Sequence, residues 1–244
     1  MRTRFLTVPA IFALAISSGC GAGFGPLQSQ SDSFDVDQAI HTIVLDGSSG
    51  DTVIQGGADV VSVSRYAEWR GETPDVEAYV QDGVLYLSDG CDSWGWCSVE
   101  HTLEVPSDVS LQLRVGSGDM DVYAVNGDVL LDTGSGDVRM QHLSGALTVN
   151  VGSGDIDGDD LGGASFLGET GSGDVELRYS EAPDLVDLHT GSGDVFLEVP
   201  DADYDLDLDT GSGDVSLDGV QDSGGANRLL RISTGSGDID IIAR

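Results

Sequence analysis

Residues 111–123 read LQLRVGSGDMDVY, and the tetrapeptide at their centre, Gly-Ser-Gly-Asp, decides the fold. It occurs seven times, at 116–119, 134–137, 152–155, 171–174, 191–194, 211–214 and 235–238. Successive copies begin 18, 18, 19, 20, 20 and 24 residues apart, which is the length of one coil of a solenoid and too short for a domain. The repeat therefore predicts an array of stacked coils.

The residues around each tetrapeptide alternate between apolar and polar. Before the first copy the apolar positions are Leu111, Leu113 and Val115, and after it they are Met120 and Val122. A period of two with one apolar face is typical of a half-buried strand. Each unit then consists of strand, turn, strand and return loop. Because one coil cannot bury its own apolar face, we expect an all-β, single-stranded parallel β-helix of coils about 18–20 residues long.

The turn residues suggest two roles for the repeated aspartate. We expect the two glycines of each copy to supply positive φ, and the carboxylate to accept hydrogen bonds from N–H groups of its own turn. The alternative is calcium held between coils by carboxylates and turn carbonyls. Stacking would place these residues in one column: Asp119, Asp137, Asp155, Asp174, Asp194, Asp214 and Asp238.

The segment before the repeats is less regular. Residues 48–51 (SSGD) read as a degenerate first copy, and strand-like runs follow at 59–65, 76–80, 84–87 and 99–105, with a hairpin turn at 81–83. We expect residues 34–110 to form an irregular β cap that contains this first coil, and residues 111–244 to form the regular solenoid.

The order of these segments resembles a known family. An early Ser-Gly-Asp strand is followed by Trp69, by DGVLYL at 82–87, by CSVE at 97–100 and LEVP at 103–106, and then by the repeats. This is similar to the bacterial "putative adhesin" family of the DUF4097 type, and the resemblance covers about residues 34–244. It implies a β-strand-repeat protein of the cell envelope and carries over no catalytic residues.

The first residues read as an export signal. Residues 1–4 are basic, residues 5–16 are apolar, and Ser17, Ser18 and Gly19 precede Cys20. An apolar stretch this short indicates a signal peptide over 1–19 rather than a membrane span. Small residues before the cysteine fit a lipobox, which predicts lipidation of Cys20 and a flexible tether over 20–33; the alternative is a plain secreted protein.

Two further cysteines lie close together. In an exported chain, Cys91 and Cys97 are expected to form a local disulfide. The loop between them carries Trp94, and Trp96 stands directly before Cys97. The two tryptophans either form an aromatic platform for a sugar or peptide or plug the cap end of the core.

The charge limits the partners. The chain holds 43 acidic and 10 basic residues, for a net charge of −33, and none of the basic residues is a lysine. Such a surface excludes nucleic acid and is repelled by anionic headgroups, so contact with a membrane is expected only through the N-terminal lipid.

Catalysis is not indicated. His41, His101, His142 and His189 stand in unrelated contexts and read as solvated strand residues. We expect no enzyme and no cofactor, with calcium as the one candidate ion. The sequence favours an envelope lipoprotein that acts as a scaffold or adhesin-like module for an unidentified envelope protein or surface polymer. The alternatives are a calcium-responsive structural module and, more remotely, a β-helix polysaccharide-active enzyme.

The end of the chain raises a last question. A terminal strand at 239–242 would leave an open edge, which invites strand addition. Either the loop at 221–227 folds over this edge, or another protein or a second copy pairs with it, giving end-to-end association.

Overall fold

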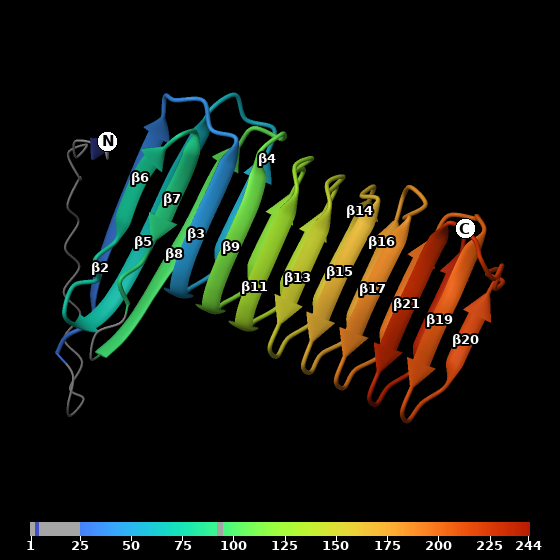
Figure 1. The fold of residues 1–244 in the computed structure, drawn as a ribbon. Helices are drawn as coiled ribbons and strands as arrows, with labels where there is room; N and C mark the ends of the chain where they lie inside the picture. Colours follow the sequence, from blue (N-terminus) through green and yellow to red (C-terminus); the bar gives the residue numbers. More distant parts are fainter. Residues whose placement is uncertain (1–2, 5–24, 92–94) are drawn as a thin grey trace.

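The computed structural model describes residues 3–4, 25–91 and 95–244, and within these ranges it contains β-strands and no helix. The strands form two stacked sheets that run the length of the molecule (Figure 1). In spatial order the first sheet contains β1 (Thr3–Arg4), β6 (Glu77–Gln81), β7 (Val84–Ser88), β3 (Thr42–Ser49), β9 (Ser110–Ser117), β11 (Val129–Ser135), β13 (Leu147–Val151), β15 (Ser165–Thr170), β17 (Leu185–Thr190), β21 (Arg228–Thr234) and β19 (Tyr204–Thr210). The second contains β2 (Gln28–Val36), β5 (Val61–Gly71), β8 (Gly95–Val105), β4 (Thr52–Gly56), β10 (Met120–Tyr123), β12 (Val138–Gln141), β14 (Ile156–Leu161), β16 (Val175–Tyr179), β18 (Val195–Val199), β22 (Ile239–Ala243) and β20 (Val215–Asp218).

Each repeat forms one coil, with one strand in each sheet and the tetrapeptide turn between them. The coils pair in parallel and in matching register, so that Leu131 of β11 lies beside Leu113 on one side and Val149 on the other. Parallel stacking of like residues, predicted from the alternation, is confirmed. The architecture is that of a two-sheet β-solenoid.

The apolar faces of the two sheets meet in one continuous core. Leu113, Leu131 and Val149 from the first sheet, and Met120 and Val138 from the second, have no exposed surface. Burial of such side chains stabilises the fold by about 1.5–3 kcal/mol each. The core therefore depends on stacking of neighbouring coils, because no coil encloses these residues alone.

The N-terminal strands include antiparallel pairs. Strand β5 lies between β2 and β8 and is antiparallel to both. Strands β6 and β7 form a hairpin in which Asp82 (φ 51°) and Gly83 (φ 75°) occupy the turn, as the sequence predicts. Strand β2 begins at Gln28, so residues 28–33, expected to belong to a flexible tether, lie in the sheet.

The last coil does not stack at the end of the array. Strands β21 and β22 insert between the coil of β17 and β18 and the coil of β19 and β20. The expectation that residues 239–242 form the open edge is therefore wrong: Ile239 and Ile241 are fully buried, and β20 is the terminal strand of its sheet. A physical reason is charge, because Arg231 of the inserted coil pairs with Asp187 on one side and Asp207 on the other.

Candidate functional site

The corner of each coil is built from glycines that allow close approach of the backbones. The second glycine of each tetrapeptide has positive φ, for example 138° at Gly136, and a Cβ there would lie 2.1 Å from the carbonyl oxygen of Gly118 in the preceding coil. The first glycine does not have positive φ, contrary to expectation. At Gly134 the constraint is space alone, since a Cβ would meet the carbonyl oxygen of Gly116 at 2.6 Å.

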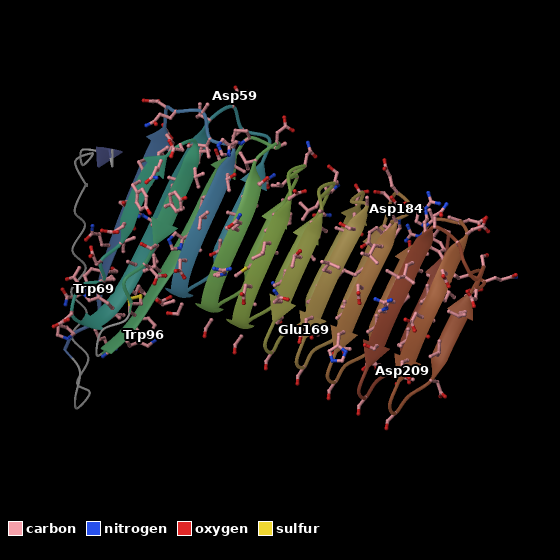
Figure 2. All side chains as sticks on the ribbon, viewed as in Figure 1. Asp59, Trp69, Trp96, Glu169, Asp184 and Asp209 are labelled. Carbon is pink, nitrogen blue, oxygen red and sulfur yellow. A yellow bond between two sulfur atoms is a disulfide. The ribbon has the colours of Figure 1, made fainter. Side chains whose placement is uncertain are left out.

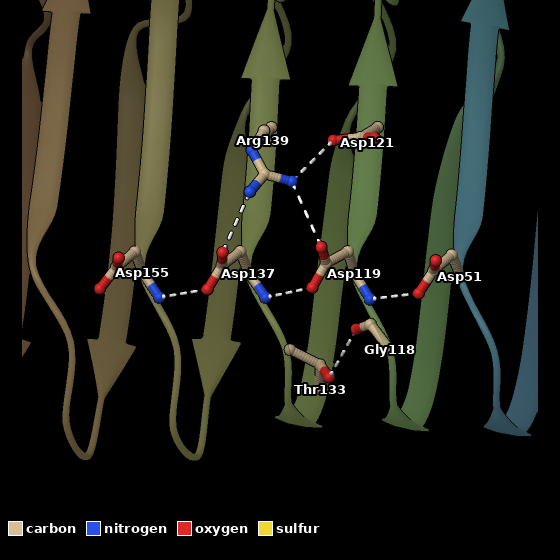
Figure 3. A network of polar contacts seen from close by, with 8 residues as sticks. All are labelled: Asp51, Gly118, Asp119, Asp121, Thr133, Asp137, Arg139 and Asp155. Carbon is tan, nitrogen blue, oxygen red and sulfur yellow. Dashed lines mark hydrogen bonds and ion pairs between the residues drawn. The ribbon is translucent and has the colours of Figure 1, made fainter.

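The repeated aspartates form a continuous ladder along this corner. In each step the backbone N–H of one aspartate donates to Oδ1 of the aspartate in the neighbouring coil, at 2.8–3.1 Å (Figure 3). The ladder runs in spatial order through Asp51, Asp119, Asp137, Asp155, Asp174, Asp194, Asp238 and Asp214. The expected bond to the carboxylate's own turn is thus wrong. The stacking of coils brings the N–H of the next turn within reach, and other turn N–H groups, such as that of Gly118, donate to the neighbouring coil's carbonyls.

Arginine neutralises part of the ladder. The guanidinium of Arg139 lies 3.0 Å from Asp137, 3.4 Å from Asp119 and 3.6 Å from Asp121 (Figure 3). Desolvation acts to lower the pKa of Arg139, but the hydrogen bond with Asp119 and the charges of all three carboxylates outweigh it and raise the pKa. Arg139 therefore joins the coils of Asp119 and Asp137 by ion pairs on the outer face of the corner.

The carboxylates do not converge on an ion site in the part of the chain that the structure describes. Within residues 3–4, 25–91 and 95–244 no group of three or more His, Cys, Asp or Glu side chains is arranged to hold a metal. One oxygen of each ladder aspartate before Asp214 instead accepts a backbone N–H. The column predicted from the repeat exists, and its observed bonds are structural.

A second ladder was missed by sequence reasoning. Threonines precede several tetrapeptides, and their Oγ1 atoms donate to the carbonyl oxygen of the second glycine in the neighbouring coil, at 2.9 Å for the half-buried Thr210 and 3.1 Å for the buried Thr234. Longer contacts of 3.3–3.5 Å join Thr133, Thr170 and Thr190 to their neighbours. The recurrence of Thr at this position on an otherwise apolar face was the available signal.

The N-terminal end holds the disulfide and two of the tryptophans. Cys91 and Cys97 are joined, with Cα atoms 5.5 Å apart. Trp94 and Cys20 lie outside the described residues. Trp69 and Trp96 both lie near the N-terminal end of the array (Figure 2). Trp96 is 48% exposed, so it does not plug the core, whereas Trp69 is only 5% exposed and packs with Ala67 and Val99.

Beside Trp69 lies a cavity of about 250 Å³ between strands β2, β5 and β8 and the segment 73–76. Its charged wall is an ion pair of Arg65 with Asp32, and the Arg65 guanidinium also lies 5.2 Å from the centre of the Phe34 ring. The lining residues are Gln30, Asp32, Arg65, Ala67, Trp69, Thr73, Pro74, Asp75, Val76 and Val99.

One histidine departs from the expectation that all four are solvated. His101 is 2% exposed, and burial, reinforced by the charge of Arg65, lowers its pKa to about 4. His41, His142 and His189 are exposed. His142 pairs with Asp160 at 3.4 Å, and His189 contacts the hydroxyl of Ser233 at 2.8 Å. The four histidines lie on separate elements and do not form a common site.

The opposite end of the array exposes part of its apolar face. Val215 and Leu217 of β20 are each 43% exposed, whereas Val195, at the equivalent place in β18, is buried. The loop after β20 covers the neighbouring strand instead: Ser223 donates to the carbonyl oxygen of Tyr204 at 2.8 Å, and Asp222 forms an isolated bridge with Tyr204. The loop at 221–227 thus covers part of the edge of β19 and leaves β20 open within the described residues.

The comparisons with known proteins identify the family of this chain. The model of the Toastrack DUF4097 family matches residues 40–243, and the chain belongs to this family, which confirms the resemblance. A solved "putative adhesin" from Bacteroides fragilis is similar over 88% of this chain and 97% of its own, with 16% identity and a TM-score of 0.55. A "putative cell adhesion protein" from Clostridium sporogenes matches over 88% of this chain and 100% of its own, with 17% identity and a TM-score of 0.43.

The comparison with curated proteins finds no significant match. At 16% identity, similarity to the Bacteroides fragilis structure shows the fold alone. Within residues 3–4, 25–91 and 95–244 there is no helix with the length and apolar character needed to cross a membrane.

Proposed function

We propose that the protein is a non-catalytic binding module of the bacterial cell envelope, exported and held at the membrane by lipid on Cys20. Its β-solenoid of 18- to 20-residue coils, with strands of residues 34–110 as the N-terminal cap, serves as a stiff scaffold. The partner is an envelope protein or a surface polymer. The name "putative adhesin" of the Bacteroides fragilis structure supports a role in surface binding.

The observation that carries this proposal is that the polar groups of the tetrapeptide corner bond neighbouring coils to each other. The ladder aspartates, the threonines before the tetrapeptides and the glycine contacts join one coil to the next. These groups give the module rigidity, because each coil is tied to its neighbours by the same bonds. Binding is then assigned to the surfaces outside the ladder: the acidic outward strand positions and the open terminal coil.

Two experiments test the proposal. Crosslinking in intact cells, followed by identification of the captured molecules, should yield a reproducible envelope partner, and its absence would contradict the binding role. Fractionation of lysed cells should place the wild-type protein with membranes and Cys20→Ala in the soluble fraction. If Cys20→Ala stayed firmly with membranes, the lipid anchor would be wrong.

A further inference from the structure

The inserted coil shows how this solenoid accepts a new strand. Three of the ten arginines lie in the last 17 residues, at 228, 231 and 244. Arg231 bridges the strands on both sides of it, at 3.2 Å from Asp187 and 3.0 Å from Asp207. Arg244 pairs with Glu198, a buried carboxylate of the coil before. The inserted coil thus places arginines against acidic residues of the coil before it and, through Arg231, of the coil after it.

Without the inserted coil, acidic residues of neighbouring coils would lie opposite each other. Asp187, Arg231 and Asp207 share one register, as do Glu198, Ile242 and Asp218. If the coils stacked in chain order, Asp187 would face Asp207 and Glu198 would face Asp218. Like charges directly opposite each other destabilise a pair of strands. In these two registers the inserted coil therefore separates acidic residues that stacking in chain order would set opposite each other.

The outer edge of β20 can accept a further strand, because it has backbone N–H groups that face outward and side chains that no further coil covers. Backbone groups of alternate residues face the same side of a strand. In the preceding coil, Gly237 and Ile239 donate outward to Ser212 and Asp214 at 2.9 Å. The equivalent N–H groups of Gly213 and Val215, and that of Leu217, face the side on which β20 has no further strand among the described residues.

The side chains of this edge specify what fits it. Val215 and Leu217 occupy core-facing positions and are exposed because no coil covers them. The ladder ends at Asp214, whose N–H donates to Asp238 at 2.8 Å. Among the described residues, no further ladder aspartate follows whose N–H could donate to the Asp214 carboxylate. Asp218 adds an outward charge at the register of Glu198. A second copy would bring the same acidic edge and a strong net negative charge, so charge complementarity favours a different, basic occupant.

We propose that the outer edge of β20 binds an extended segment of a partner protein, with basic side chains facing outward and apolar side chains facing the core, by strand addition. The partner's carbonyl oxygens accept from Val215 and Leu217, its apolar side chains cover those residues, and its cations lie against Asp218 and Asp214. This mode of recognition takes affinity from the backbone and specificity from alternate side chains. The inference rests on the proposed binding function and names the partner's chemistry.

A synthetic peptide in which arginine and valine alternate is the probe, and its glutamate–valine counterpart is the comparison. Fluorescence anisotropy with the full mature chain should show the arginine peptide binding at least about tenfold more tightly, with affinity that falls as salt is added. Leu217→Pro removes an N–H that faces the open side of β20, where the described residues provide no further strand. It should therefore weaken binding about tenfold while the melting temperature stays close to that of the wild type.

Two further variants serve as controls. Ser216→Ala alters the same strand but keeps its open N–H groups, and it should bind like the wild type. Asp218→Asn should weaken the arginine peptide and reduce the salt dependence. Equal binding of both peptides, or equal binding to wild type and Leu217→Pro, would overturn the proposal. So would a wild type that dimerises in sedimentation and becomes monomeric with Leu217→Pro, because the occupant would then be a second copy.

Cell crosslinking separates this inference from the proposed function. A partner captured equally by wild type and Leu217→Pro, together with equal peptide binding, refutes the β20 edge and leaves the binding function standing. Edge-dependent peptide binding without any captured partner supports the edge and refutes the envelope-binding role.

Discussion

Replacing Asp155 tests whether the aspartate ladder acts through hydrogen bonds or through charge. Its Oδ1 accepts the N–H of Asp174 at 2.8 Å, and its own N–H donates to Asp137 at 3.1 Å. Asp155→Ala removes the acceptor but keeps the donor. Asp155→Asn keeps a carbonyl oxygen at the same place and removes only the charge, which makes it the matched control.

The magnitudes separate the two variants. Loss of the bond leaves a turn N–H without its partner, and because the site is exposed, water replaces part of it, so Asp155→Ala should cost about 1 kcal/mol. Asp155→Asn loses charge assistance but also relieves repulsion from the neighbouring carboxylates, which is about 1 kcal/mol per pair at the spacing of coils in water before screening by salt. Its free energy of unfolding should stay within about 0.5 kcal/mol of the wild type.

Thermal and urea unfolding followed by circular dichroism would measure both variants. For a chain of this size, 1 kcal/mol corresponds to a fall in melting temperature of about 2–4 °C, expected for Asp155→Ala alone. Equal stability of Asp155→Ala and the wild type would show that the ladder bond contributes nothing. Asp155→Asn as unstable as Asp155→Ala would show that charge, not the acceptor, matters.

Three further predictions use the same unfolding assays. Gly136→Ala should lower the free energy of unfolding by about 3 kcal/mol or more, because the φ of Gly136 is 138° and a Cβ there would lie 2.1 Å from a backbone oxygen. Gly224→Ala is the control and should be neutral, because a Cβ there would meet nothing within 4 Å. Similar losses of stability in both variants would contradict the packing argument. The folded-state pKa of His101, about 4, lies below the ordinary histidine pKa of 6.5, so the unfolded state binds the extra proton between these two values. Stability should therefore fall as the pH drops from 6.5 to 4, by up to about 1.4 kcal/mol per pH unit. His101→Gln should lack this part of the pH dependence, and an unchanged pH profile would refute it. Melting in millimolar calcium and in chelator should give the same midpoint, because a ladder oxygen of each carboxylate before Asp214 is already hydrogen-bonded; a calcium-dependent rise would restore the cation-responsive alternative.

The repeated unit and its parallel pairing could be predicted from sequence because alternation and turn chemistry are local. Leu113 and Met120 identify the core face without any knowledge of neighbouring coils. The hairpin at 81–83 was equally local, since Asp82 and Gly83 suit positive φ.

The order of the coils could not be predicted, because every coil carries the same pattern and fits every other. The difference lies in outward residues such as Asp187, Arg231 and Asp207, whose pairing depends on which strands adjoin. The burial of His101, by contrast, had a local signal that was missed: His101 alternates with Val99 and Leu103 on the inward face of β8, and all three are buried.

Cysteine crosslinking tests the inserted order of the last coil most directly. His189, Ser233 and Asp209 share one register, with Ser233 in the middle. In a Cys20→Ser background, oxidation should join His189→Cys to Ser233→Cys, whose strands are adjacent. The pair of His189→Cys and Asp209→Cys should stay unlinked, because two strand spacings of about 4.8 Å exceed the reach of a disulfide. Mass-spectrometric mapping of the bridged peptides decides the result. A bridge between positions 189 and 209, with none between 189 and 233, would show that the coils stack in chain order and that β20 is not the open edge.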